Sequence, residues 1–205
     1  MLNLQFAMNL LPTVIRDEPM IIIISSPSGG GKTTIAKGLL AIFPNFKLCR
    51  SYTTRTQKEG LGEEKYIFVS KEDFEEIISK GEFIEWAEVF GDYYGTPNSE
   101  FSSLLDRGSD ILLDIDVDGA EKIKALYPEA VLIFLLSPSI LELKRRLIKR
   151  KRESEEELIE RLKRAEMEIK RSENYDYRVV NEEIEKTIFL IKEIIIKERR
   201  KKDVV

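Results

Sequence analysis

Short apolar segments alternate with longer amphipathic segments along most of the chain. The apolar segments are rich in isoleucine, leucine and valine, which is typical of parallel strands covered on both faces, and the amphipathic segments predict helices. The predicted strands are 20–25, 46–52, 111–116, 130–136 and 177–180. The predicted helices are 32–43, 98–106, 117–126, 139–149, 154–173 and 184–202. Strands that alternate with helices predict an α/β fold with a mainly parallel sheet.

One segment, from about residue 50 to 94, breaks this alternation. Residues 83–90 and 93–96 have the pattern of short strands, and the Gly-Asp pair between them is a turn signal. A helix over 71–80 is predicted before them, because Ser70 begins a capping-box pattern. We therefore expect a smaller lobe of short strands and one helix beside the main sheet.

Composition bounds the class of protein. The chain has 205 residues, of which 42% are apolar, so one domain with a sizeable core is expected. A net charge of −4 argues against general affinity for nucleic acid or an anionic membrane, and no apolar run approaches the length of a membrane span. A single cysteine cannot form an intramolecular disulfide, which fits a reducing, cytoplasmic setting. The absence of histidine leaves any chemistry to carboxylates, lysines and arginines. Residues 1–19 are interpreted as an N-terminal extension.

The first predicted strand runs into a glycine-rich segment, SSPSGGGKTT, at residues 25–34. Glycines let backbone N–H groups point at an anion, and the N-terminus of the following helix adds positive potential. Lys32 can then reach the β- and γ-phosphates of a nucleotide, and the Thr33 hydroxyl can ligate Mg²⁺. Ser26 stands where the pattern GxxxxGK(S/T) has its first glycine, which matters little if position 26 needs no positive φ. The alternative is a glycine-rich turn without a ligand.

Two carboxylates, Asp114 and Asp116, lie at the end of the strand predicted over 111–116. The carboxyl end of a parallel strand is where open α/β sheets bind ligands. Two carboxylates close together at such a strand end repel each other unless a cation lies beside them, and a hydrated metal ion would supply that cation. The alternative for Asp116 is a helix cap.

Two segments are rich in cations. Arg50 to Arg55, RSYTTR, with Lys58 after it, suits a second phosphate, but such a run is also typical of a solvated loop. The run KRRLIKRKR, 144–152, lies between two predicted helices, and acidic residues follow it. It suggests a nucleic-acid patch, two solvated helix faces, or an arginine-bearing lid over a transferring phosphoryl group.

Taken in this order, the motifs resemble those of the guanylate kinase family, enzymes that phosphorylate GMP with ATP. The similarity covers nearly the whole chain from about Met20. The segments that carry it are SSPSGGGKTT, SYTTR (51–55), YIFVS (66–70), GEFIEWAEVFGDYYGT (81–96), LLDIDVDGA (112–120), the lid pattern (144–161) and VVN (179–181). The resemblance implies a three-layer P-loop kinase fold with a mainly parallel sheet. It implies a core of residues 20–50, 97–143 and 174–205, an inserted α+β GMP-binding lobe of about 51–96 and a helical lid of about 144–173.

The resemblance also implies roles for individual residues. Those implied for ATP are Ser28, Gly29, Gly30, Gly31, Lys32, Thr33, Thr34 and Asn181. Those implied for GMP are Ser51, Arg55, Lys58, Tyr66, Glu85, Tyr94, Thr96 and Asp114. The implied catalytic cations are Lys32, Arg55, Arg146, Arg150 and Arg161, and Thr33 and Asp116 are implied for Mg²⁺, Asp116 directly or through water. ATP and GMP are the implied partners, with no nucleic acid or membrane, and a homodimer is possible.

Glu85 is the most informative of these residues. Guanine presents an N1–H and an N2 amino group side by side, and one carboxylate can accept from both; adenine offers a bare N1 acceptor instead. The alternative is an ordinary outward residue on an alternating strand. Three departures from the family pattern stand out: Lys58 replaces a usual arginine, the segment 58–66 is one residue shorter, and Asp118 replaces a usual glutamine. A guanylate-kinase-like interaction module and a small-molecule kinase with another acceptor are the competing functions.

Overall fold

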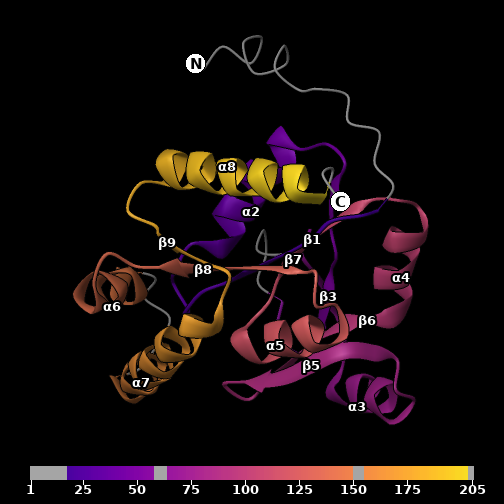
Figure 1. Cartoon of the computed structure of the whole chain (residues 1–205). Coiled ribbons are helices and arrows are strands. Elements are labelled where there is room, and N and C mark those ends of the chain that lie inside the picture. The colour runs from indigo at the N-terminus through magenta and orange to yellow at the C-terminus, as the bar shows by residue number, and fades with distance from the viewer. Residues whose placement is uncertain (1–17, 58–63, 150–154, 203–205) are drawn as a thin grey trace.

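The larger sheet has five parallel strands. The computed structural model describes residues 18–57, 64–149 and 155–202 (Figure 1). The strands lie in the order β2-β7-β1-β8-β9 and all pair in parallel. Their bounds are β1 (Ile21–Ser25), β2 (Phe46–Leu48), β7 (Asp110–Asp114), β8 (Val131–Leu136) and β9 (Tyr177–Val180). The predicted α/β class with a mainly parallel sheet is confirmed.

Helices cover both faces of this sheet (Figure 1). The isoleucines of β1 explain why, because alternate side chains of a strand point to opposite faces. Ile22 and Ile24 pack in the same core as residues of α2 (Lys32–Ile42) and α8 (Ile184–Lys202). Ile21 and Ile23 pack in a second core with residues of α4 (Asn98–Asp106) and α5 (Val117–Leu126). All four are at most 2% exposed, and each buried side chain contributes about 1.5–3 kcal/mol.

The second sheet is smaller and mixed. Its order is β4-β3-β6-β5, with β3 parallel to β4 and antiparallel to β6, and β5 antiparallel to β6. The bounds are β3 (Ser51–Thr53), β4 (Tyr66–Phe68), β5 (Phe83–Val89) and β6 (Asp92–Pro97). Helix α3 (Lys71–Ser79) packs on it through Phe74, whose ring stacks on Phe83 and Tyr93. Ser70 caps α3 as predicted, accepting a bond from the Asp73 amide.

The strand predicted over 46–52 is wrong as one element. The chain forms β2 in the large sheet, and the Cys49 amide still donates to Leu112 there. Two residues later the Ser51 amide donates to Lys65, and the chain has become β3 of the second sheet. Buried and part-buried residues occur through both strands, with only Lys47 and Arg50 exposed between Phe46 and Thr53, so periodicity does not reveal the change of partner.

Two helices form a separate arm beside the sheets (Figure 1). They are α6 (Ile140–Lys149) and α7 (Glu155–Arg171), and a 3₁₀ turn (Ser172–Asn174) leads on to β9. Leu143, Leu147 and Ala165 form their shared core. The predicted cap of α6 is confirmed, since the Glu142 amide donates to Ser139, whereas Ser154 lies outside the described residues. Among the described residues, none of the helices has both the length and the apolar content to cross a bilayer.

Candidate active site

A cavity of about 950 Å³ lies at the carboxyl ends of β1 and β7. Its walls are the glycine-rich loop, the strand ends, the second sheet and α7, so residues far apart in sequence meet there. This is the edge at which open α/β sheets bind ligands. The residues predicted for nucleotides that line it are Ser28–Thr34, Ser51, Arg55, Tyr66, Glu85, Tyr94, Asp114, Asp116 and Arg161.

The glycine-rich loop has the backbone of an anion cradle. Gly29 and Gly31 have φ of 88° and 95°, values that residues with a side chain rarely adopt. Gly31 is also the N-cap of α2. Ser26 is not among the described residues with positive φ, so the missing first glycine leaves no strain. Its side chain instead lies against Gly30, where a Cβ would come within 2.4 Å of the Ser26 Oγ. Glycine at position 30 therefore leaves the room that the Ser26 side chain occupies.

Lys32 and Asn181 hold this loop from two sides. The Lys32 ammonium donates to the Ser26 carbonyl at 2.9 Å. The buried Asn181 amide donates to the Gly30 carbonyl at 2.8 Å, and its oxygen accepts from Thr187 of α8. Asn181 is thus placed behind the loop and is not among the residues that line the cavity.

Asp114 joins the loop to the second sheet. One of its oxygens accepts from the Thr33 hydroxyl at 3.2 Å and pairs with the Lys65 ammonium at 2.7 Å. The side chains of Lys65 and Asp114 are only 8% and 0% exposed. The other oxygen of Asp114 is buried and, among the described residues, has no hydrogen-bond partner. Lys65 is a residue of the site that the sequence reasoning missed.

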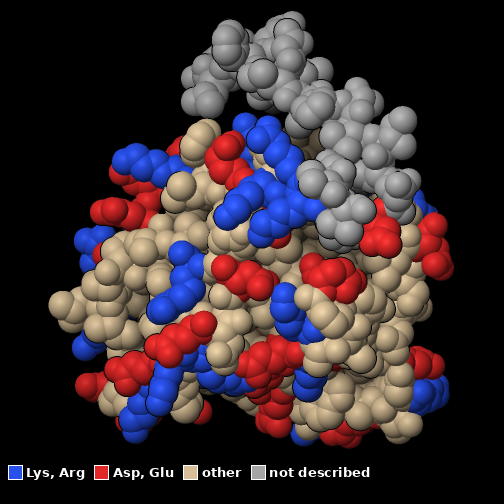
Figure 2. Space-filling model, viewed as in Figure 1, with Lys and Arg blue, Asp and Glu red and all other residues tan. Residues whose placement is uncertain are grey.

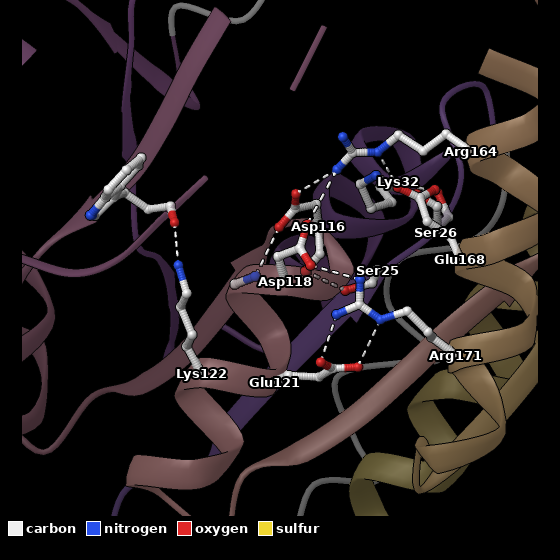
Figure 3. A network of polar contacts seen from close by, with 12 residues as sticks. Ser25, Ser26, Lys32, Asp116, Asp118, Glu121, Lys122, Arg164, Glu168 and Arg171 are labelled. Atoms are coloured by element: carbon white, nitrogen blue, oxygen red, sulfur yellow. Dashed lines mark hydrogen bonds and ion pairs between the residues drawn. The ribbon is translucent and has the colours of Figure 1, made fainter. Parts of the chain in front are cut away.

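Asp116 is a helix cap and an ion-pair partner at once. One oxygen accepts from the Gly119 amide at the start of α5, which confirms the capping alternative, and the other pairs with Arg164 of α7 at 3.0 Å. Figure 3 shows Arg164 between Asp116, Asp118 and Glu168. Arg164 lines the cavity and was not predicted. Its spacing of three residues from Arg161, which puts both on one helix face, was the available signal.

The base of α7 is tied to α5 through Asp118. Arg171 donates through Nη1 to Asp118 at 2.7 Å and through Nε and Nη2 to the two carboxylate oxygens of Glu121 (Figure 3). These bonds raise the pKa of the Arg171 guanidinium further above its ordinary value. Asp118, which stands where the family pattern has glutamine, therefore contributes an ion pair that an amide could not.

A group of cations and hydroxyls on and beside the second sheet forms another wall of the cavity. Arg55, Lys65, Tyr66 and Tyr94 line the cavity together, and the rings of the two tyrosines are 5.7 Å apart. Burial raises the pKa of both hydroxyls, so they stay protonated and able to donate. Such a set suits a phosphate. Lys58, predicted beside it, lies outside the described residues.

Glu85 is buried, not outward. It is 5% exposed and lies on β5 opposite Thr96 of β6. The Thr96 hydroxyl donates to the Glu85 carboxylate at 2.5 Å. Burial raises the pKa of Glu85 to about 7, although the bond from Thr96 opposes the shift. A Cβ on Gly119 would come within 2.5 Å of its Oε2, so that glycine makes room for the carboxylate. Ser51 lines the cavity with Glu85, whereas Thr96 supports Glu85 from behind.

The predicted lid arginines do not all reach the cavity. Arg161 does, and its Nη1 donates to the Ser28 hydroxyl at 3.0 Å. Arg146 donates to Glu142 and to the Asn181 carbonyl instead, and Arg150 lies outside the described residues. Exposed Arg145 also pairs with Glu142, and the face drawn in Figure 2 carries cations and anions side by side. These placements favour solvated helix faces over a nucleic-acid patch for the described part of 144–152.

A parallel sheet whose first strand runs into a phosphate loop, with a second sheet and a helical arm around one cavity, defines a P-loop kinase fold. The family model described as guanylate kinase matches residues 18–198, more than half of the chain. The chain belongs to the guanylate kinase family.

Known proteins of this family match at similar length. The guanylate kinase of Clostridium tetani is 44% identical over 188 residues, covering 91% of this chain and 90% of the relative. That of Caldanaerobacter subterraneus subsp. tengcongensis is 42% identical over 190 residues, covering 92% of each. The crystal structure of guanylate kinase from Anaplasma phagocytophilum matches with a TM-score of 0.75 and 38% identity, covering 90% of this chain and 88% of that chain.

Proposed function

We propose that this protein transfers the γ-phosphoryl group of ATP to GMP and gives ADP and GDP. The observation that carries the acceptor's identity is Glu85, a buried carboxylate in the same cavity as the phosphate loop. It can accept from guanine N1–H and N2–H together, and adenine would leave it facing a lone pair. Ser51 on the cavity wall and Thr96 behind Glu85 complete the guanine site.

The phosphate loop holds the donor nucleotide. Backbone N–H groups of the glycine-rich segment and the helix N-terminus bind the phosphates, and Thr34 follows at the start of α2. Lys32 moves from the Ser26 carbonyl to the β- and γ-phosphates. Asn181 acts by bracing the loop through Gly30, and contact with the nucleotide itself stays a prediction.

The residues present fit a Mg²⁺ ion beside the loop. Thr33 and Asp114 already lie within hydrogen-bond distance of each other, and Asp114 has a buried oxygen without a hydrogen-bond partner in the described chain. Hydroxyl, carboxylate and water oxygens are the ligands that Mg²⁺ prefers. When bound, the ion would neutralise charge across the β- and γ-phosphates. Asp116 remains a partner through water, since both its oxygens are engaged by Gly119 and Arg164.

Cations of the second sheet and of α7 place the two phosphates for transfer. Arg55 and Lys58 clamp the GMP phosphate, with the Tyr66 and Tyr94 hydroxyls donating beside them. A nonbridging oxygen of that phosphate attacks the γ-phosphorus, the new O–P bond forms, and the bond to the β–γ bridging oxygen breaks as ADP leaves. A phosphate oxygen is already a nucleophile, so the step needs positive charge and exclusion of water more than a base.

Arginines of the helical arm supply positive charge to the transferring group. Arg161 is at the loop already and Arg164 is beside it, whereas Arg146 requires movement of the arm or remains an outer contact. The role of Arg150, which lies outside the described residues, stays a prediction. Such closure is a common step in kinases.

A coupled ADP-release assay with GMP, dGMP, AMP, UMP and CMP tests the proposal. GMP should be turned over with MgATP, and AMP should be slower by at least about a hundredfold, because a buried polar group left unpaired discriminates strongly. Equal rates on AMP and GMP would refute the role of Glu85, and no turnover with any acceptor would refute the function.

A further inference from the structure

Phe90 lies at the turn between β5 and β6 in an unusual backbone conformation. Its φ is 54°, and it is the one non-glycine residue with positive φ among the described residues. A bulky side chain in this region is strained, and such strain persists where surrounding contacts favour it. Gly91, the next residue, also has positive φ, at 80°, so this two-residue turn needs the conformation at both positions. Glycine or asparagine at position 90 would adopt it at lower cost than phenylalanine, so we expect contacts of the ring that favour Phe90.

The ring is covered by two arginines of α7. The guanidinium carbon of Arg161 is 4.3 Å from the ring centroid and that of Arg164 is 5.4 Å from it. Phe90 lines the cavity with both. The tip of the second sheet therefore contacts the helical arm through the two side chains that carry the arm's charge into the site.

Stacking is well suited to positioning these groups. An aromatic face attracts a guanidinium and fixes its plane, while the N–H groups in that plane still donate to oxygens. Arg161 does so to the Ser28 hydroxyl and Arg164 to Asp116. One ring on the acceptor side thus orients two arginines whose donors point at the phosphate loop and the end of the sheet.

We infer that Phe90 is a positioning residue that couples the acceptor lobe to the lid, so that GMP binding in the second sheet orients Arg161 and Arg164 on the phosphates of ATP. This inference rests on the proposed function. It makes the β5–β6 turn part of the transfer step although Phe90 itself touches neither reacting phosphate.

The test replaces Phe90 in three ways. Phe90→Leu keeps apolar volume and removes the ring; Phe90→Asn removes the ring and tolerates positive φ, so it serves if the leucine variant fails to fold. Phe90→Tyr keeps the aromatic face. We expect kcat for GMP to fall about twofold to thirtyfold in the first two, as the loss of a cation–π contact predicts, and to be retained with tyrosine.

A binding measurement separates positioning from a general structural effect. A non-hydrolysable ATP analogue is titrated by calorimetry with and without saturating GMP. In the unaltered protein GMP should tighten binding of the analogue, and Phe90→Leu should lose that tightening while each nucleotide alone binds as before. Phe189→Leu is the matched control, because Phe189 lies on α8, is 58% exposed and also has a cation, Lys192, over its ring. It should leave both readouts unchanged.

The outcomes are distinct. Unchanged kcat and unchanged tightening in both ringless variants would overturn the role of Phe90. Equal losses with leucine and tyrosine would also overturn it, because the aromatic face would not matter. If the unaltered protein released no ADP with GMP, the proposed function would fail first, and the variants would not be needed to show it.

Discussion

The ionisation of Glu85 should control how strongly GMP binds. Burial raises its pKa to about 7 against an ordinary value of 4.5; the Thr96 bond opposes the shift, nearby Asp116 adds to it and Lys122 opposes it. Only the ionised form accepts from both guanine donors. With this pKa the ionised fraction is about 0.9 at pH 8 and about 0.1 at pH 6. The Kd for GMP should therefore rise about tenfold from pH 8 to pH 6.

The assay is a GMP titration by calorimetry at pH 6, 7 and 8. The GMP phosphate also titrates, near pH 6, so a variant is needed in which the phosphate still titrates and position 85 does not. Glu85→Gln is that variant. It should bind GMP about tenfold to a hundredfold more weakly at pH 8, because bonds to a charged acceptor are lost, and its remaining pH dependence should be that of the phosphate alone.

A pH dependence that is the same in both proteins would refute the reasoning, and so would a flat profile in the unaltered one. An ordinary carboxyl would stay more than about 90% ionised over this range.

The raised pKa of Glu85 should also change how the stability of the protein depends on pH. A raised folded-state pKa stabilises the protein most below the unfolded value, so the free energy of unfolding should fall between about pH 4.5 and 7, and less so in Glu85→Gln.

Three further substitutions test the site. Lys32→Ala should reduce kcat at least about a hundredfold by removing charge from the transferring group; near-normal turnover would exclude the loop as the donor site. Gly119→Ala should raise KM for GMP about tenfold or more and leave KM for ATP unchanged, since its Cβ would displace Glu85; parallel changes in both constants would contradict this. Lys65→Met should lower the free energy of unfolding by about 3–5 kcal/mol in a urea titration, because Asp114 is left buried and unpaired. Adding Asp114→Asn should recover most of that loss, and no recovery would show that the pair is not its cause.

Features encoded locally were predictable from the sequence. The β1 isoleucines, the phosphate loop and the caps at Ser70 and Ser139 each depend on residues within a few positions of one another. The split of 46–52 into two sheets was not predictable, because no glycine or proline separates the two halves and the change shows only in their distant partners, Leu112 and Lys65.

The site was predicted less completely than the fold. Glu85 was found through the family pattern, since alternation along β5 suggested an outward residue. Lys65 has no local signal that separates it from other cations in a charged chain, and Arg164 has only its spacing from Arg161. The contacts with Asp114 and Asp116 make the two cations site residues. Phe90 shows the same limit, because positive φ at an aromatic residue contradicts local preference and has to be seen in the structure.

Ser26 and Gly30 cannot evolve independently. The serine side chain occupies the space that any Cβ at position 30 would need, so in this background every substitution of Gly30 meets a clash at 2.4 Å. With glycine at 26, the nearest remaining atom would be the Pro27 carbonyl oxygen at 3.0 Å, and the restriction on position 30 would loosen. The order in which the two positions change thus decides which loop sequences are accessible. Mutational scans of Gly30 will report its tolerance only for chains that carry serine at position 26.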